Sequence, residues 1–142
     1  MDLLVSEARG PVEGRRVVPP SKSLHQRALV LAHLADTPTR IEAAGEVGDD
    51  VQSLARSLDA VGRWTNGAWG ESRESRSLHL GLGATGFRFA LAAATLRPSG
   101  ARTLVTGRQP LLERPHGDLA RALERLGAKI KRRHSGAYRV HG

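Results

Sequence analysis

Apolar residues recur every three or four positions in four stretches of the chain, a spacing typical of amphipathic helices. This pattern predicts helices at about 22–35, 50–61, 86–97 and 116–126. Between the helices, short β-like runs with Gly, Asn and Ser turns between several of them predict strands. These strands are expected at 39–44, 62–69, 77–82, 102–107, 128–133 and 137–142. A further pair of strands is expected near the start, at 3–9 and 15–19.

Part of this pattern occurs twice. LARSLDAVG at 54–62 returns as LARALERLG at 119–127, and upstream of each copy a helix begins near an arginine, Arg27 or Arg88. The repeated unit is helix, strand, helix, strand, strand. A strand–helix–strand unit favours a parallel, right-handed crossover. We therefore expect an α/β fold in which each copy forms a small sheet with two helices on one side, and the two copies pack helix against helix.

Length and composition exclude several classes of protein. The 142 residues suffice for one domain with an ordinary core, since 39% of them are hydrophobic. There is no cysteine, which excludes a disulfide framework, a thiolate metal site and a cysteine nucleophile. No run reaches the ~18 apolar residues of a membrane span, and the N-terminus has acids where a signal peptide has basic residues. We expect a cytoplasmic protein that makes no membrane contact.

The net charge of +8 indicates an anionic partner, and it comes almost wholly from arginine. Charge alone does not distinguish nucleic acid from small anionic substrates. Nucleic-acid modules usually pair a basic face with aromatic stacking platforms, whereas the two Trp, two Phe and one Tyr here are scattered singly. The densest basic run, KIKRRH at 129–134, fits a solvated strand edge better than a binding surface. We therefore expect no nucleic-acid partner.

The start of the first predicted helix carries a group of polar residues that suits an anion. Ser21 is a natural N-cap after Pro20, and Lys22, Ser23 and Arg27 fall in the first two turns, where free backbone N–H groups and the helix dipole favour negative charge. A capped amphipathic helix with surface charges explains the same residues without a ligand. The residues expected to turn inward on this helix are Leu24, Ala28, Leu31 and Ala35.

A glycine-rich loop, GLGATGFRF at 81–89, precedes a second helix. Glycine lets the backbone approach a ligand closely. Gly81, Gly83 and Gly86 fit the G-x-G-x-x-G spacing of dinucleotide sites, but no acidic residue follows about 20 residues on, where such sites need one. A dinucleotide site is therefore not expected.

A third helix start also carries a basic residue. In LLERPHGDL, Pro115 is expected at the first helical position just after Arg114. All three predicted helix starts that we compared thus offer a cation beside free N–H groups.

Three segments carry a resemblance to a known family: VPPSKSLHQRA, LGLGATGFR and TGRQPLLERPHGDLARALERLGAKI. Together, in this order and at similar separations, they resemble the 5-enolpyruvylshikimate-3-phosphate synthases over nearly the whole chain. The resemblance implies repeated βαβαββ units of the inverse α/β barrel type, of which about two are present. It also implies transfer of the enolpyruvyl group of phosphoenolpyruvate to the 5-hydroxyl of shikimate 3-phosphate, with release of phosphate and no metal or organic cofactor.

The resemblance also assigns site residues by position. Those that match the family's shikimate 3-phosphate contacts are Lys22, Ser23 and Arg27. Those that match its phosphoenolpyruvate contacts are Lys22, Ala84 and Arg114. Those that match catalytic positions are Lys22 and Asp50, and those that match supports of the loop are Thr85 and Arg88. Such a cationic clamp suits substrates that each carry a carboxylate and a phosphate.

Four positions depart from the family's usual residues. Pro20 stands in place of Gly, and Gln26 in place of Asn. Leu82 replaces Asn and so removes a hydrogen-bonding side chain from the ligand edge. Ala84 stands where many members have Gly, and its methyl group is expected to exclude the inhibitor glyphosate more than the shorter phosphoenolpyruvate.

The family folds into two domains of three units each, so this chain resembles only its N-terminal portion. We expect residues 1–19 to form a strand pair associated with the other domain, and 20–142 to form an incomplete N-terminal domain. The family's later substrate contacts and proton-transfer acids lie outside the chain. The resemblance therefore implies one wall of a site that is inactive alone and needs the rest of the enzyme or a partner chain.

Two alternatives remain. A UDP-sugar enolpyruvyl transferase shares this fold, but it would carry a K-N element in place of S-K-S and usually a cysteine in its loop. A non-catalytic module that binds anionic ligands or nucleic acid would account for the charge of +8 and for the missing catalytic acids.

Overall fold

A computed structural model describes residues 10–11, 13–15, 18–35, 37–42, 45–62, 64–65, 68–69 and 72–142. Its helices are α1 (Lys22–Leu34), α2 (Asp49–Val61), α3 (Ala84–Ala94), α4 (Gln109–Leu112) and α5 (Gly117–Arg125). Its strands are β1 (Trp64–Thr65), β2 (Ala68–Trp69), β3 (Arg76–His79), β4 (Arg102–Thr106), β5 (Lys129–Arg132) and β6 (Tyr138–His141). Within these ranges no helix combines the length and the apolar character that crossing a membrane requires.

Four strands form one mixed sheet in the order β3-β4-β6-β5. β3 and β4 are parallel, with Leu78 opposite Val105, and α3 makes the crossover between them. β6 is antiparallel to both of its neighbours, so that Val140 lies between Thr103 and Ile130. The strand–helix–strand unit expected from the sequence is therefore present here, and the α/β class is confirmed.

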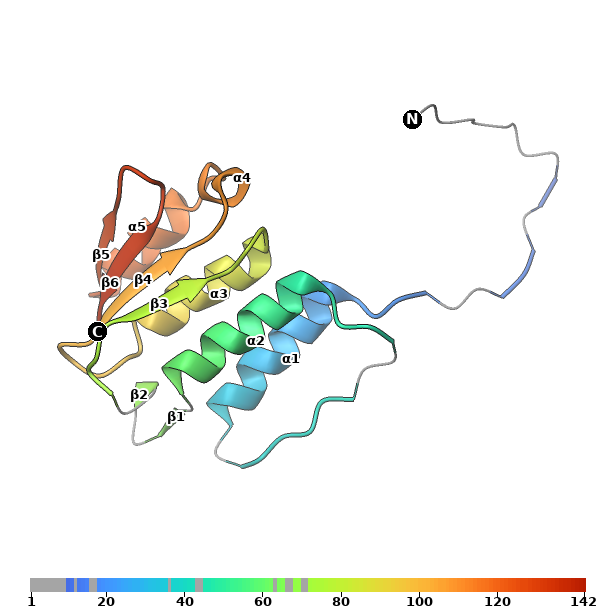
Figure 1. Cartoon of the computed structure of the whole chain (residues 1–142), viewed down its shortest axis with the longest axis horizontal. Helices are drawn as coiled ribbons and strands as arrows, with labels where there is room; N and C mark the ends of the chain where they lie inside the picture. Colours follow the sequence, from blue (N-terminus) through green and yellow to red (C-terminus); the bar gives the residue numbers. More distant parts are fainter. Residues whose placement is uncertain are drawn as a thin grey trace.

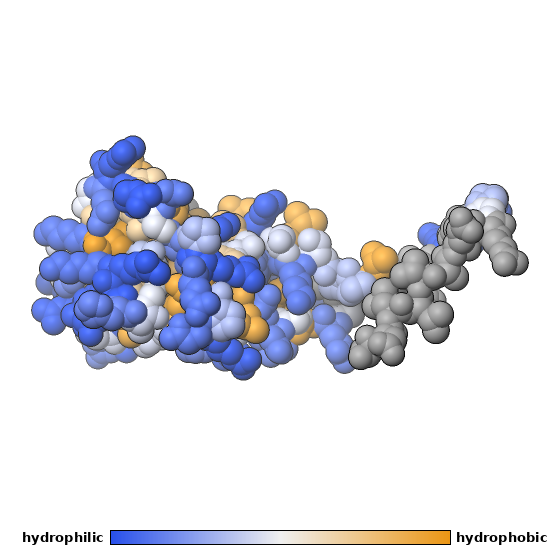
Figure 2. Space-filling view, turned by 90° about the horizontal axis from the view of Figure 1, so that it is seen from above, coloured by the Kyte–Doolittle hydropathy of each residue, from blue (hydrophilic) through white to orange (hydrophobic). Residues whose placement is uncertain are grey.

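The hydrophobic core lies between this sheet and the helices α2 and α3. The buried face of α2 follows the predicted helical spacing and consists of Val51, Ser53, Leu54, Ser57, Leu58 and Val61. α3 packs on both α2 and α1, so the helices of the two sequence copies do meet, as expected (Figure 1). The face seen in Figure 2 is mostly hydrophilic, and its hydrophobic residues form separate small patches.

Helix α1 packs with a different face from the one predicted. Leu24 and Leu31 were expected inside but are 64% and 65% exposed, and Ala28 and Ala35 are only half-buried. The residues that pack against the core are Leu29, Val30 and Leu34. The prediction was wrong because apolar residues occupy two sides of this helix, and spacing alone does not tell which side meets α2 and α3.

Several predicted elements differ in the structure. Residues 39–42 are not a strand, which is consistent with the lack of a neighbouring described strand to complete their hydrogen bonds. The predicted strand 62–69 is a short antiparallel pair, β1 and β2. The expected pair near the start falls largely outside the described residues, and its described positions 15 and 18–19 are not in a strand.

The start of α5 and the short helix α4 also depart from prediction. His116 is the N-cap of α5, so Pro115 precedes the cap instead of opening the helix. The N-cap has a φ of −104°, which histidine adopts readily but the proline ring, fixed near about −65°, does not. α4 spans four residues, too few for apolar periodicity to reveal.

His116 is a buried polar residue of the core, with 1% of its surface exposed. Its ring stacks on Phe87, with ring centroids 4.4 Å apart. Its Nε2 lies 3.0 Å from the Leu111 carbonyl oxygen, which accepts, so Nε2 carries the proton. Burial lowers the pKa of His116, the bond to Leu111 opposes this change, and three nearby guanidinium groups lower the pKa further. They belong to Arg88, Arg114 and Arg132.

We predict that His116 makes the free energy of unfolding depend on pH. As the pH falls, the imidazole of the unfolded chain, with a pKa of about 6.5, binds a proton at a higher pH than the imidazole of the folded chain does. The contribution of neutral His116 to the free energy of unfolding is therefore fully present above the unfolded pKa. It is lost as the pH falls from there toward the lowered pKa of the folded protein. His116→Leu should remove this contribution, which is at most about 1.4 kcal/mol per pH unit for one proton.

Urea unfolding at about pH 7 and about pH 5 measures the effect. His134→Leu, on the exposed turn between β5 and β6, is the matched control because it removes a histidine without touching the core. Equal losses of stability on acidification in the wild type and in His116→Leu would contradict the prediction.

Candidate functional site

The starts of three helices lie together at one end of the molecule. α1, α2 and α3 pack side by side and run in the same direction, so their N-terminal ends are adjacent (Figure 1). Lys22 opens α1, Asp49 opens α2 and Ala84 opens α3. The unpaired N–H groups of a helix start and its dipole favour an anion. This end of the molecule is therefore the candidate functional site.

Lys22 connects the start of α1 to that of α2. Ser21 caps α1 as predicted, because its side-chain oxygen accepts a hydrogen bond of 3.4 Å from the Leu24 N–H. The exposed Lys22 side chain then passes over Gly48, the residue before α2, where an added Cβ would lie 3.1 Å from the lysine Cε. The absence of a side chain at Gly48 leaves the lysine this path.

The glycine-rich loop brings α3 against Asp50. A Cβ added at Gly83, the N-cap of α3, would lie 3.2 Å from the Asp50 Cβ and 3.3 Å from its Cγ. Gly81 has a φ of +57°, in the left-handed region that glycine adopts at low cost. Its carbonyl oxygen accepts a hydrogen bond of 2.8 Å from the Arg108 N–H. The loop is thus held between α2 and the segment after β4, and Asp50 lies against Gly83, the residue before Ala84.

A pocket of about 310 Å³ lies where these segments meet. It is lined by Asp49, Asp50, Ser53, Arg56, Gly81, Leu82 and Arg108. Leu82 is 45% exposed and is the one large apolar residue of the lining, as its departure from the family's usual Asn implied. The remaining side chains of the lining are polar or charged.

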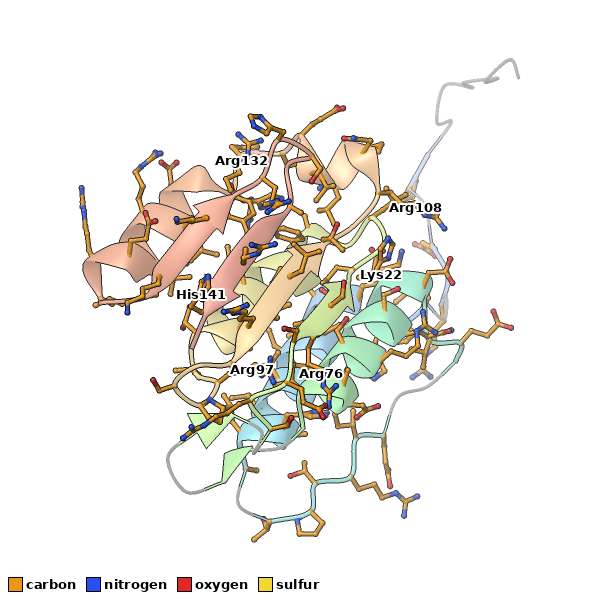
Figure 3. The ribbon with its side chains drawn as sticks, turned by 60° about the vertical axis from the view of Figure 1, so that its left-hand side comes forward. Lys22, Arg76, Arg97, Arg108, Arg132 and His141 are labelled. Carbon is orange, nitrogen blue, oxygen red and sulfur yellow. The ribbon has the colours of Figure 1, made fainter. Side chains whose placement is uncertain are left out.

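Arg108 was not predicted from the sequence. It follows β4 directly, as the glycine-rich loop follows β3. Because the carboxyl ends of parallel strands meet at one edge of a sheet, this position is a signal that sequence analysis can use. Lys22 and Arg108 lie toward the same end of the molecule in Figure 3.

A second group of predicted residues surrounds His116. Arg114 lies in the exposed turn between α4 and α5, and Arg88 follows Phe87, the ring on which His116 stacks. Arg132 of β5 reaches the same turn, since its Nη2 donates a hydrogen bond of 3.5 Å to the Leu112 carbonyl oxygen. All three guanidinium groups are near enough to lower the pKa of His116. The predicted residues Arg88 and Arg114 thus both lie near His116, as does Arg132, which the sequence analysis had not proposed as a site residue and which Figure 3 labels.

Three other predicted site residues lie on α1 and in the first turn of α3. Ser23 and Arg27 are exposed on α1, and among the described residues no hydrogen bond or ion pair joins them to Asp50 or Arg114. Thr85 is half-buried in the first turn of α3. In the described part of the chain there is no cluster of three or more side chains suited to hold a metal ion.

Gln26, which departs from the family's usual Asn, does not face the site. It is 2% exposed, and its Nε2 would lie 3.6 Å from a Cβ added at Gly86. It is therefore a contact between α1 and α3, and its effect on a ligand is indirect.

Similar known proteins indicate the family to which this chain belongs. A family model described as EPSP synthase (3-phosphoshikimate 1-carboxyvinyltransferase) matches residues 6–141. Curated relatives with the name 3-phosphoshikimate 1-carboxyvinyltransferase include one from Bradyrhizobium diazoefficiens, 34% identical over 89% of this chain and 29% of its own length. Another, from Sulfurovum sp., is 38% identical over 84% of this chain and 30% of its own length.

A third relative of the same name, from Shewanella sediminis, is 36% identical over 92% of this chain. The chain covers 33% of that relative, so it spans about a third or less of the length of these curated relatives. The family model covers nearly all of the chain. The chain therefore belongs to the EPSP synthase family.

Proposed function

We propose that this chain forms one wall of the active site of a 3-phosphoshikimate 1-carboxyvinyltransferase. The names of its relatives support this reaction over a UDP-sugar transferase or a non-catalytic module. The structural observation that carries the proposal is the convergence of Lys22, Asp50 and Ala84 at three adjacent helix starts. A helix start with a cation beside it suits the phosphate and carboxylate groups of both substrates.

Shikimate 3-phosphate is assigned to the start of α1. Lys22, Ser23 and Arg27 are exposed there, so they are free to contact a ligand from solvent. Ser23 and Arg27 are four residues apart and share one face of the helix, which places a hydroxyl and a guanidinium on the same side. Arg27 can bind a phosphate through two parallel hydrogen bonds, and Lys22 adds a point charge.

Phosphoenolpyruvate is assigned to the side of α3 and α4. Its backbone contact is at Ala84, and Arg114 and Lys22 neutralise its charges. Thr85 supports the loop from the first turn of α3, and Arg88 adds positive charge beside Arg114. In the proposed arrangement the two substrates meet between Lys22 and the glycine-rich loop.

The proposed reaction is addition followed by elimination. The 5-hydroxyl oxygen adds to C2 of phosphoenolpyruvate and gives up its proton to a base, while an acid adds a proton at C3, which gives a tetrahedral intermediate. The bond between C2 and the phosphate oxygen then breaks, phosphate leaves, and the proton lost from C3 restores the double bond. Lys22 and Asp50 are the groups of this chain that could hold or move these protons. No metal or organic cofactor is required.

The rest of the site is proposed to come from outside this chain. The order β3, α3, β4, α5, β5, β6 supports one βαβαββ unit, and α1 and α2 belong to a second. We assign 20–142 to an incomplete N-terminal domain and 1–19 to a strand pair associated with the other domain. The remaining enzyme, or a partner chain, closes over the substrates. A cytoplasmic location without nucleic-acid or membrane contact stays a prediction.

We predict that the isolated chain has no turnover. Catalysis needs groups that converge from both sides of a cleft from which water is excluded. Phosphate release with both substrates should stay at background for the 142-residue chain, and it should exceed background when the chain is part of a complete enzyme. Turnover by the chain alone would contradict the one-wall proposal, and no turnover by the complete enzyme would contradict the proposed reaction.

A second prediction separates the two substrates. In the complete enzyme, Lys22→Ala and Arg27→Ala should weaken binding of shikimate 3-phosphate, whereas Arg114→Ala should chiefly weaken phosphoenolpyruvate. Each loss should be about 1.5–3 kcal/mol, as for a hydrogen bond to a charged group. Isothermal titration measures both affinities. Arg125→Ala, on the exposed last turn of α5, is the matched control. Unchanged affinities in all three site variants would exclude the assignment.

A third prediction concerns inhibition. Because the Ala84 methyl group takes up space beside the phosphoenolpyruvate site, the complete enzyme should tolerate glyphosate, which is longer than phosphoenolpyruvate. Ala84→Gly should strengthen glyphosate binding by roughly 1–3 kcal/mol, with little change for the substrate. The test is the inhibition constant of glyphosate, measured for the unsubstituted enzyme and for Ala84→Gly. Equal inhibition constants would show that Ala84 does not face the ligand.

A further inference from the structure

Strand β5 forms one edge of the main sheet. Among the described strands it has a neighbour only on the side of β6, and Figure 1 shows it at the margin of the molecule. The Arg133 N–H donates a hydrogen bond of 2.8 Å to the Ala137 carbonyl oxygen, which fixes the alternation of the antiparallel ladder. By that alternation, the backbone N–H and C=O groups of Ile130 and Arg132 point away from β6. The edge of β5 can therefore bond to an added strand.

The outward face of this edge is basic. Lys129 and Lys131 alternate with the buried Ile130, so they lie on the side of the sheet away from the helices, where both are exposed. Lys131 lies directly opposite Arg139 of β6, and Lys129 lies opposite His141. Two cations directly opposite each other destabilise a strand pair. This pairing therefore favours an anion bound beside it.

No ion pair between described residues neutralises this surface. Residues 125–142 contain six Lys and Arg and no Asp or Glu, and none of these six cations takes part in an ion pair within the described part of the chain. The hairpin of β5 and β6 also carries a hollow of about 500 Å³. It is lined by Lys131, Arg132, Arg133, His134, Ser135 and Arg139. An anionic partner would meet no carboxylate in this hollow.

The chemistry of the edge favours an acidic segment of another protein over the other anionic partners. A nucleic acid suits it less, because Tyr138 is the one Phe, Tyr or Trp in residues 100–142, and it is buried and so cannot stack on a base. A second copy of this chain also suits it less, since two β5 edges side by side would bring the same lysines together. A partner strand gains affinity from its backbone hydrogen bonds and specificity from its alternating side chains.

We propose that β5 binds an extended acidic segment of a partner protein, which adds to the four-stranded sheet as a further strand. The backbone of this segment bonds to Ile130 and Arg132. Its acidic residues, at every second position, lie beside Lys129 and Lys131 on the outward face. The solvated edge expected for 129–134 is thus also a docking edge. This inference does not depend on the proposed function, because it uses none of the proposed substrate contacts.

Peptide binding to the 142-residue chain tests the proposal. The probes are two synthetic peptides of equal composition, one that alternates Glu with Thr and one that has all of its Glu in a single block. At about 0.15 M salt, which screens distant exposed charges, the alternating peptide should bind roughly three- to tenfold more tightly. Its binding should slow hydrogen exchange at the Ile130 and Arg132 amides, and it should change the Lys131 amide less, because that amide already bonds to β6.

A pair of charge reversals locates the binding surface. Lys131→Glu should weaken binding of the alternating peptide roughly three- to tenfold, because a like charge then faces the acidic strand. Arg125→Glu makes the same change of charge on the exposed last turn of α5 and is the matched control. Circular dichroism verifies that both variants are folded.

Three results would overturn the inference. Equal affinities of the two peptides, with unchanged exchange at Ile130 and Arg132, would show attraction by charge without strand addition. Equal losses of affinity in Lys131→Glu and Arg125→Glu would show that β5 is not the binding surface. Tighter binding of a short duplex DNA than of either peptide would show a nucleic-acid surface instead. None of these measurements involves a substrate, so each outcome leaves the proposed function to its own tests.

Discussion

The close approach of α3 to α2 is the contact on which the rest of the site depends. Gly83, the N-cap of α3, favours this approach, since a Cβ added there would lie only 3.2 Å from the Asp50 Cβ. The buried residues of α2 then pack on the core. With α1 packed against both α2 and α3, three helix starts share one end of the molecule. This packing gathers at one end of the molecule the unpaired N–H groups and helix dipoles that favour an anion.

Features set by local sequence were predicted well. The apolar spacing gave four of the five helices, and Ser21 was recognised as a cap because its hydroxyl satisfies a free N–H group of the first turn. Four strands of the main sheet were also predicted, since their runs are bounded by turns. Features that depend on contacts with neighbouring helices and strands were not predicted. The buried face of α1 depends on where α2 and α3 lie, and the burial of His116 depends on Phe87, so neither could be predicted from local pattern.

The two sequence copies show how tertiary context changes the same pattern. Leu58 and Val61 of α2 are 1% and 5% exposed, because this helix packs against α1, α3 and β3. At the position equivalent to Val61, Leu126 is 85% exposed. The copies also differ in their strands, since the four-stranded sheet follows the second copy's order and 39–42 form no strand. Similar residues thus predict the helices, but not the depth at which each helix is buried.

The proposed site residues were chosen chiefly by resemblance, and packing brings several of their helix starts together. Lys22, Asp50 and Ala84 are far apart in the sequence, yet each belongs to a helix start that adjoins the next. Arg108 was missed because no motif includes it, although its place just after β4 marks the edge of the sheet where the glycine-rich loop also lies.

The most direct test of the convergence is to record amide chemical shifts of the chain while shikimate 3-phosphate is added. The account predicts that the largest shifts occur at the helix starts, in residues 22–24, 49–51 and 81–85. The hairpin of β5 and β6 carries the densest basic run, and residues 131–139 serve as an internal comparison. Largest shifts in that hairpin, with the helix starts unchanged, would contradict the account.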